Sequence, residues 1–196
     1  MDYAERLNRI IDTVGKGYSN KGYNAFENQA ELKALENSNI FFTTSVLGMK
    51  AISHVIEDQA VKLGKPFRLY SAFQKFSRVN EQRKRYLKIL ETKNPVYLFG
   101  IPDAPLWHDP NLIQVPLAEP ASTTQPSLAN NWFVVLHNPQ FVSMALVTRE
   151  LYNPSSSASA SNKLIYRNFE GFWTYDKAAI SQIVEVLDGY IKQSLG

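Results

Sequence analysis

The 196-residue sequence contains no cysteine. Disulfides, thiolate nucleophiles, iron–sulfur clusters and cysteine-bound zinc are therefore excluded. No stretch approaches the roughly 20 apolar residues that a membrane-spanning helix needs, and the N-terminus lacks the apolar run of a secretory signal peptide. We therefore expect a cytoplasmic protein with no transmembrane segment.

The short motifs of common enzyme classes are also missing. There is no Gly-x-Ser-x-Gly nucleophile elbow, no Gly-x-Gly-x-x-Gly dinucleotide motif and no pair of histidines at metal-binding spacing. Gly17 and Gly22 are spaced as in a phosphate-binding loop, but Tyr23 stands where the lysine belongs. These absences predict a protein without catalytic residues, metal or cofactor.

Histidine is scarce, with three residues in the whole chain. His54 lies away from the apolar face of a predicted helix, with Glu57 and Asp58 three and four residues further on. Residues at this spacing are neighbours on a helix surface. We interpret His54 as a solvated residue paired with one of these carboxylates.

Charge of either sign is modest. The net charge of +3 is too small to indicate nucleic-acid binding unless the basic residues gather in one place. The hydrophobic fraction of 44% is ordinary for a globular protein, and a chain of this length buries roughly 70% of its surface on folding. We predict one folded domain with an N-terminal appendage.

The N-terminal segment begins with an amphipathic helix. Tyr3, Leu7 and Ile10 recur at the spacing of one helix face, and charged residues occupy the other face. An apolar helix face of this kind is suited to packing on another protein. We expect it to bind a protein partner or a second copy of the chain; the alternative is that residues 1–40 cap the domain.

Periodicity and turn residues predict the remaining elements. We interpret residues 16–24 as a loop, 26–36 as a second helix, 1–40 as an N-terminal helical extension and 41–196 as the main domain. Strands are predicted near 67–72, 96–99, 112–117, 131–136, 141–148 and 169–175. A cap among residues 43–45 begins a predicted helix that ends at Leu63, and Asp176 caps the last predicted helix. Asn80 caps a predicted helix through Leu90, whose buried face contains Tyr86, Leu87 and Leu90. The fold class is α/β, a central mixed sheet of about five or six strands flanked by helices.

One segment concentrates basic side chains. Arg83, Lys84, Arg85 and Lys88 lie close together in a predicted helix. A solvated helix face explains them most simply, and an acidic protein partner bound through Arg83, Lys84 and Arg85 is the functional interpretation. Nucleic-acid binding is a third and less favoured alternative, which requires affinity to fall steeply with salt.

Aromatic residues gather in the last predicted strand. The run Phe169-Glu170-Gly171-Phe172-Trp173-Thr174-Tyr175-Asp176 places aromatic side chains on both faces of that strand. Core packing explains this pattern. A ligand pocket with aromatic walls and Glu170 as its carboxylate is the alternative.

These motifs, in this order, resemble the DICT sensory domain, a family named after diguanylate cyclases and two-component systems. The resemblance rests on Ser53-His54-Val55-Ile56-Glu57-Asp58, Phe73-Gln74, Val96-Tyr97-Leu98-Phe99-Gly100, Trp132-Phe133-Val134-Val135 and the aromatic run above. It implies a non-catalytic input or adaptor domain of bacterial signalling, linked to light responses or photosynthetic assemblies. It supplies no binding residues, and we expect the signal to leave through contacts with a protein partner.

Ligands of open α/β sheets bind beyond the carboxyl ends of the strands. We therefore expect a small-ligand pocket beyond the 96–99 strand, lined by Phe73, Gln74, Gly100, Asp103, Glu170 and Trp173. The alternative is that residues 100–103 form only a turn. An enzyme acting on a phosphorylated or nucleotide substrate, with Asp103 or Glu170 as acid or base, is the rival function.

Overall fold

The computed structural model describes residues 2–23, 32, 37–120, 125–151 and 167–196. Its strands are β1 (Ser19–Tyr23), β2 (Ile40–Ser45), β3 (Arg68–Lys75), β4 (Val96–Ile101), β5 (Leu112–Pro116), β6 (Asn131–His137), β7 (Met144–Leu151) and β8 (Asn168–Thr174). Its α-helices are α1 (Tyr3–Thr13), α3 (Val46–Lys62), α4 (Phe76–Glu81), α5 (Arg83–Leu90) and α6 (Lys177–Leu195). Short 3-10 turns cover Gly15–Gly17 and Leu128–Asn130.

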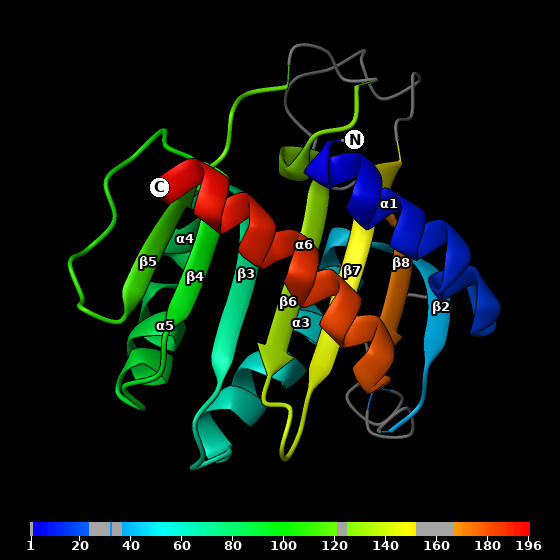
Figure 1. Ribbon diagram of the computed structural model, residues 1–196, viewed down its shortest axis with the longest axis horizontal. Coiled ribbons are helices and arrows are strands. Elements are labelled where there is room, and N and C mark those ends of the chain that lie inside the picture. Colours follow the sequence, from blue (N-terminus) through cyan, green and yellow to red (C-terminus); the bar gives the residue numbers. More distant parts are fainter. Residues whose placement is uncertain (1, 24–31, 33–36, 121–124, 152–166) are drawn as a thin grey trace.

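The strands form one mixed sheet in the order β1-β2-β8-β7-β6-β3-β4-β5. The pairs β1–β2, β3–β4 and β4–β5 are parallel, and the other neighbours are antiparallel. Helices α1 and α6 cover one face of the sheet, and α3, α4 and α5 lie on the other (Figure 1). Each face has its own hydrophobic cluster, so side chains alternating along each strand enter different cores. The predicted α/β class is confirmed.

Local sequence accounts for the ends of the long helices. The Ser45 hydroxyl accepts a hydrogen bond from the Gly48 amide at the start of α3, at 3.5 Å. The Asp176 carboxylate accepts from the Ala178 amide at 2.8 Å at the start of α6. Such side chains satisfy amides that have no partner within the helix. Both caps were predicted from the sequence.

The sheet is larger than predicted, because two strands were not recognised. β1 was taken for part of a loop: it is polar, contains Gly22 at φ +67°, and pairs on one side only. β2 was read only as the cap of the following helix, although its residues pair with β8 along their whole length. The predicted helix over 26–36 lies almost entirely outside the described residues.

The basic segment is divided between two helices instead of forming one. The backbone leaves the helical region at Gln82, with φ −101° and ψ 8°, so α4 ends and α5 begins there. Asn80 is therefore inside α4 and does not cap the second helix. Ile89 is fully buried, whereas Leu87, which was expected in the core, is 39% exposed.

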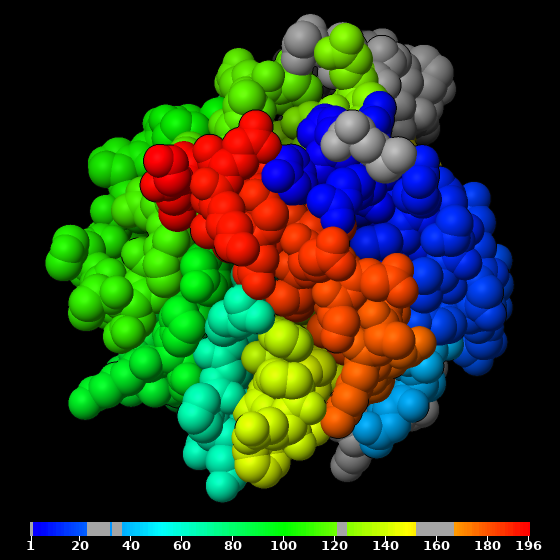
Figure 2. Space-filling view, viewed as in Figure 1, coloured from blue at the N-terminus to red at the C-terminus, as the bar shows by residue number. Residues whose placement is uncertain are grey.

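The apolar face of α1 is covered by the chain itself. Leu7 is fully buried and Ile10 nearly so, in the cluster that α1 shares with α6 and the sheet. Figure 2 shows α1 and α6 touching in one layer over this face. Two hydrogen bonds from Arg149 of β7 to the Asp12 carboxylate, at 2.8 and 2.9 Å, hold the far end of α1. The face expected to meet a partner is thus not exposed.

No helix among the described residues has both the length and the apolar character needed to cross a membrane.

Gly171 allows a close approach of two central strands. A Cβ atom there would lie 2.1 Å from the Val147 carbonyl oxygen and 2.6 Å from Thr148 Cα. We expect Gly171→Ala to lower the free energy of unfolding by about 3 kcal/mol, because backbone atoms of β7 would have to move. The comparison is Gly17→Ala, whose Cβ meets nothing within 4 Å. Urea unfolding of both variants tests this; equal midpoints would contradict it.

Candidate functional site

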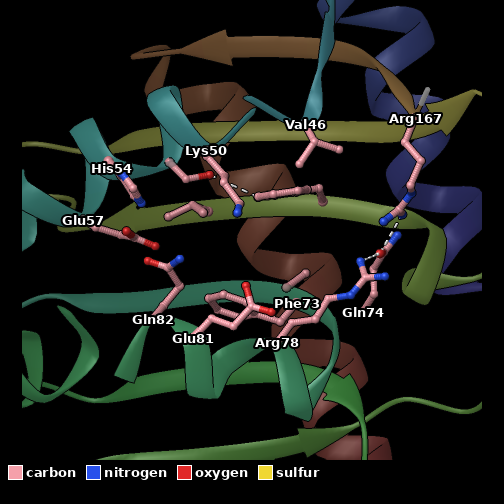
Figure 3. Close-up of a pocket in the computed structure, with 14 residues that line it drawn as sticks. Val46, Lys50, His54, Glu57, Phe73, Gln74, Arg78, Glu81, Gln82 and Arg167 are labelled. Atoms are coloured by element: carbon pink, nitrogen blue, oxygen red, sulfur yellow. Dashed lines mark hydrogen bonds between the residues drawn. The ribbon is translucent and has the colours of Figure 1, made fainter. Parts of the chain in front are cut away.

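A cavity of about 160 Å³ lies between the helix layer of α3 and α4 and the sheet (Figure 3). Its size is similar to that of an engineered protein cavity of about 150 Å³ that binds benzene. The lining residues are Val46, Lys50, Ser53, His54, Glu57, Ala72, Phe73, Gln74, Arg78, Glu81, Gln82, Trp132, Val134 and Arg167.

The long wall of the cavity is one face of α3. Val46, Lys50, Ser53 and Glu57 follow one another at helical spacing, so their side chains point the same way. Ser53 donates to the Met49 carbonyl and accepts from the Trp132 indole of the opposite wall, at 3.1 Å. This contact fixes the distance between helix and sheet.

The other wall depends on an irregularity at the end of β3. The pairing register of β3 with β4 shifts between Ala72 and Lys75, and Gln74 has φ +59°. A bulge of this kind redirects side chains. Consecutive residues Phe73 and Gln74 therefore both line the cavity instead of alternating across the sheet.

Glu57 lies at one end of the cavity and is only 2% exposed. Its Oε1 accepts a hydrogen bond from the Tyr86 hydroxyl at 2.7 Å. Its Oε2 lies 3.5 Å from Arg85 Nε, yet it accepts no hydrogen bond among the described residues. Burial raises the pKa of Glu57 to about 7, although the Tyr86 hydrogen bond and the Arg85 charge act in the opposite direction.

His54 stands beside Glu57 at this end (Figure 3). It is half-buried and lines the cavity, in place of the solvated position that we expected. Burial is the main cause of its lowered pKa, and the Arg85 charge adds to it, while a hydrogen bond with Gln82 opposes the change. His54 is therefore biased toward the neutral form.

Two guanidinium groups meet at the opposite end of the cavity. Arg78 Nη1 and Arg167 Nη2 both donate to Gln74 Oε1, at 2.5 and 2.6 Å. Arg167 also makes two hydrogen bonds to the Glu150 carboxylate, each 2.5 Å long. No carboxylate of the described residues is within ion-pair distance of Arg78. Burial, with Arg167 adding to it, lowers the pKa of Arg78.

Of the six residues predicted to line a pocket, the structure brings Phe73 and Gln74 together at this cavity. Asp103 is exposed, and its carboxylate accepts hydrogen bonds from the Ser77 amide and hydroxyl at 2.8 and 2.7 Å. Its pKa is lowered mainly by the Ser77 hydroxyl. Gly100 packs closely under Phe76, whose ring a Cβ would meet at 2.7 Å.

The two predicted residues of the aromatic run lie on opposite faces of β8. Trp173 is fully buried in the core beneath α3. Glu170 pairs with Arg149 on the face that α1 covers, at 2.7 Å. Asp103, hydrogen-bonded to Ser77 of α4, and Glu170, paired with Arg149 of β7, are the two acids that the rival enzyme hypothesis names as alternatives, and they have different neighbours. The cavity borders the carboxyl end of β3, the strand next to the predicted one.

The basic segment divides between the site and the surface. Arg85 pairs with Asp58 and Glu57, so it is part of the environment of the buried carboxylate. Arg83 lies over the Trp107 ring, 5.6 Å from its centroid. Lys84 is exposed. Within the described part of the chain, no three His, Asp or Glu side chains gather as metal ligands do.

Sequence reasoning missed most of the polar groups of the cavity. Lys50 and Glu57 share one face of a predicted helix, and that spacing was a usable signal. Arg78 and Arg167 are 89 positions apart and meet only because the bulge brings Gln74 between them. No pattern within a short stretch of the sequence predicts such a contact.

The fold and site define a mixed α/β domain with a polar-ended cavity beneath one helix layer. A family model described as a sensory domain in diguanylate cyclases and two-component systems, DICT, matches residues 28–150. The match spans more than half of the chain, so this protein belongs to the DICT family of sensory domains. It includes every lining residue except Arg167. No curated protein and no solved structure matches the sequence.

The raised pKa of Glu57 predicts a pH-dependent stability. The carboxyl group titrates near 4.5 ordinarily and near 7 when folded, so the folded protein binds more protons between these values. The free energy of unfolding therefore falls as pH rises through this range, by about 3 kcal/mol in total. Glu57→Gln, which is neutral throughout, should gain stability relative to the unaltered protein on going from about pH 5 to about pH 8.

Urea unfolding at the two pH values measures this difference. Glu81→Gln is the matched control, because Glu81 lines the same cavity but is exposed. An equal offset between Glu57→Gln and the unaltered protein at both pH values would show that the Glu57 carboxyl titrates normally.

Proposed function

We propose that this protein is a non-catalytic sensor that binds a small organic ligand in the cavity between α3 and the sheet, and that binding changes its affinity for a protein partner. The observation that carries this proposal is a cavity whose two ends hold buried polar atoms without hydrogen-bond partners among the described residues, Glu57 Oε2 and Arg167 Nη1.

A ligand with complementary polar groups gains free energy at these two atoms. Leaving one buried polar atom without a hydrogen bond costs about 1–3 kcal/mol, and a ligand that supplies the missing groups recovers this energy. The walls between the two ends are largely apolar, through Phe73, Trp132 and Val134. Apolar walls with a few convergent polar groups are typical of small-molecule sites.

Helix α5 provides a route from the cavity to the surface. Tyr86 and Arg85 of α5 contact the Glu57 carboxylate directly. The outer side of the same helix carries the exposed residues Arg83, Lys84 and Lys88. A ligand that binds Glu57 competes with Arg85 and so acts on the helix that presents this basic surface. We infer that an acidic surface of a signalling protein is the partner.

The geometry favours binding over catalysis. Asp103 and Glu170 are engaged by Ser77 and Arg149 and belong to different parts of the molecule. General acid–base catalysis needs groups positioned together at a substrate. The polar groups of the cavity, in contrast, lie at its two ends with apolar walls between them, an arrangement typical of a ligand-binding site.

A substitution that fills the cavity without changing the protein surface tests this proposal. We expect Val46→Trp to abolish retention of small molecules, because Val46 lines the cavity and the indole would occupy it. The control is Leu47→Trp, at the adjacent position of α3, which is 65% exposed. Native mass spectrometry of each full-length protein, after incubation with the dialysable fraction of a bacterial lysate and desalting, measures bound mass. Identical spectra for the unaltered protein and Val46→Trp would refute the proposal.

A further inference from the structure

We propose that the ligand is an elongated aromatic carboxylate, bound with its carboxylate against Arg78 and Arg167 and with a hydrogen-bond donor at its other end against Glu57. This inference rests on the proposed ligand-binding function and adds the chemical class of the ligand. The polarity of the cavity, the shape of its walls and the strained backbone at Gln74 carry it.

The Gln74 end of the cavity is built to receive an anion. Two guanidinium groups converge there on one neutral amide oxygen, and Glu150, the one carboxylate hydrogen-bonded to them among the described residues, is bound by Arg167. The charges of Glu81 and Asp103 act on Arg78 from farther away. Arg78 keeps its charge without an ion-pair partner among the described residues, and Arg167 Nη1 is buried without a hydrogen bond. A carboxylate matches the paired N–H groups of guanidinium.

The backbone is strained where it holds these two cations. Gln74 has φ +59°, a left-handed conformation that costs a non-glycine residue on the order of 1–3 kcal/mol. The conformation turns its side chain, only 8% exposed, between Arg78 and Arg167. Its amide nitrogen donates to Glu150 at 3.2 Å, which fixes its oxygen toward the guanidinium groups. The left-handed conformation of Gln74 thus places its amide oxygen between the two guanidinium groups.

The opposite end offers a carboxylate to a donor when Glu57 is ionised. Glu57 Oε1 already accepts from the Tyr86 hydroxyl, and Oε2 accepts no hydrogen bond among the described residues. A hydroxyl or amine donates to Oε2, whereas a second carboxylate would face a carboxyl group. Figure 3 shows Glu57 and His54 at one end and Arg78 and Arg167 at the other, with Lys50 between them. The ligand is therefore polar at two unlike ends.

The length and walls of the cavity determine the size and aromatic character of the part of the ligand between its two polar ends. Val46 and Glu57 are eleven residues apart on α3, a distance of about 16 Å along the helix axis at 1.5 Å per residue. A volume of about 160 Å³ accommodates one ring with short substituents. Phe73 and Trp132 offer aromatic surfaces to that ring, which favours edge or offset stacking.

Isothermal titration calorimetry with three related probes tests this assignment. The first is 4-hydroxyphenylacetate, which has both groups. Phenylacetate lacks the donor, and 4-hydroxyphenylacetamide replaces the carboxylate by a neutral amide. We expect 4-hydroxyphenylacetate to bind roughly tenfold or more tightly than either analogue. The comparison uses the unaltered full-length protein, so it does not depend on how any variant folds.

Two arginine variants identify the end at which the carboxylate binds. Arg78→Met removes one of the two guanidinium charges at this end and should reduce the preference for the acid over the amide, while the preference over phenylacetate remains. Arg83→Met is the matched control, because Arg83 lies outside the cavity over Trp107, and it should leave both preferences unchanged. Circular dichroism melting confirms that each variant is folded.

The outcomes separate this inference from the function on which it rests. Equal binding of the acid and the amide, or an unchanged preference in Arg78→Met, would overturn the carboxylate assignment while ligand binding stands. The same holds if no probe binds although a Val46-sensitive mass from the dialysable fraction does. If no probe binds and no such mass is found, both proposals fail.

Discussion

The burial of the Glu57 carboxyl group is the constraint on which the layer of α3, α4 and α5 depends. Because the group is only 2% exposed, it has to be held by neighbours, and both come from α5: the Tyr86 hydroxyl and the Arg85 guanidinium. A buried charge left without such partners is severely destabilising. The packing of α3 against α5 therefore depends on the polar groups of the cavity, and a change in one alters the other.

The opposite face of the sheet is built differently and is closed. There, α1 and α6 share an apolar cluster with the sheet, and the ion pairs of Arg149 with Asp12 and Glu170 join α1 to two strands. Partly buried groups paired in this way fix geometry more than they contribute free energy. The layer of α1 and α6 therefore closes one face of the sheet. The layer of α3, α4 and α5, where the helix breaks at Gln82 and the sheet bulges at Gln74, borders the cavity in which we propose that a ligand binds.

How much of the fold and of the cavity could be predicted depends on how far apart in the sequence the residues that determine each feature lie. Asp176 as a helix cap and the paired strands β6 and β7 follow from residues adjacent in sequence, and both were predicted. β1 is a polar edge strand without alternation, so no periodicity marks it. The helical spacing of apolar residues places Leu7 on an apolar helix face, but it does not indicate whether the chain itself or a partner covers that face. The cationic end of the cavity depends on a left-handed residue and on contacts across distant segments, which composition and spacing do not encode.

A sensory domain needs two arrangements of similar free energy that a ligand can distinguish. In the function proposed above, the environment of Glu57 supplies them, because Arg85 lies between two carboxylates, pairing with exposed Asp58 as well as with Glu57. A donor bound at Oε2 would replace the weaker of these interactions and leave Arg85 to Asp58. Since the pKa of Glu57 is near 7, loss or gain of its proton would shift the same balance. On this proposal, the free energy available to the switch is that of one buried carboxyl group, and α5 carries the change to the protein surface.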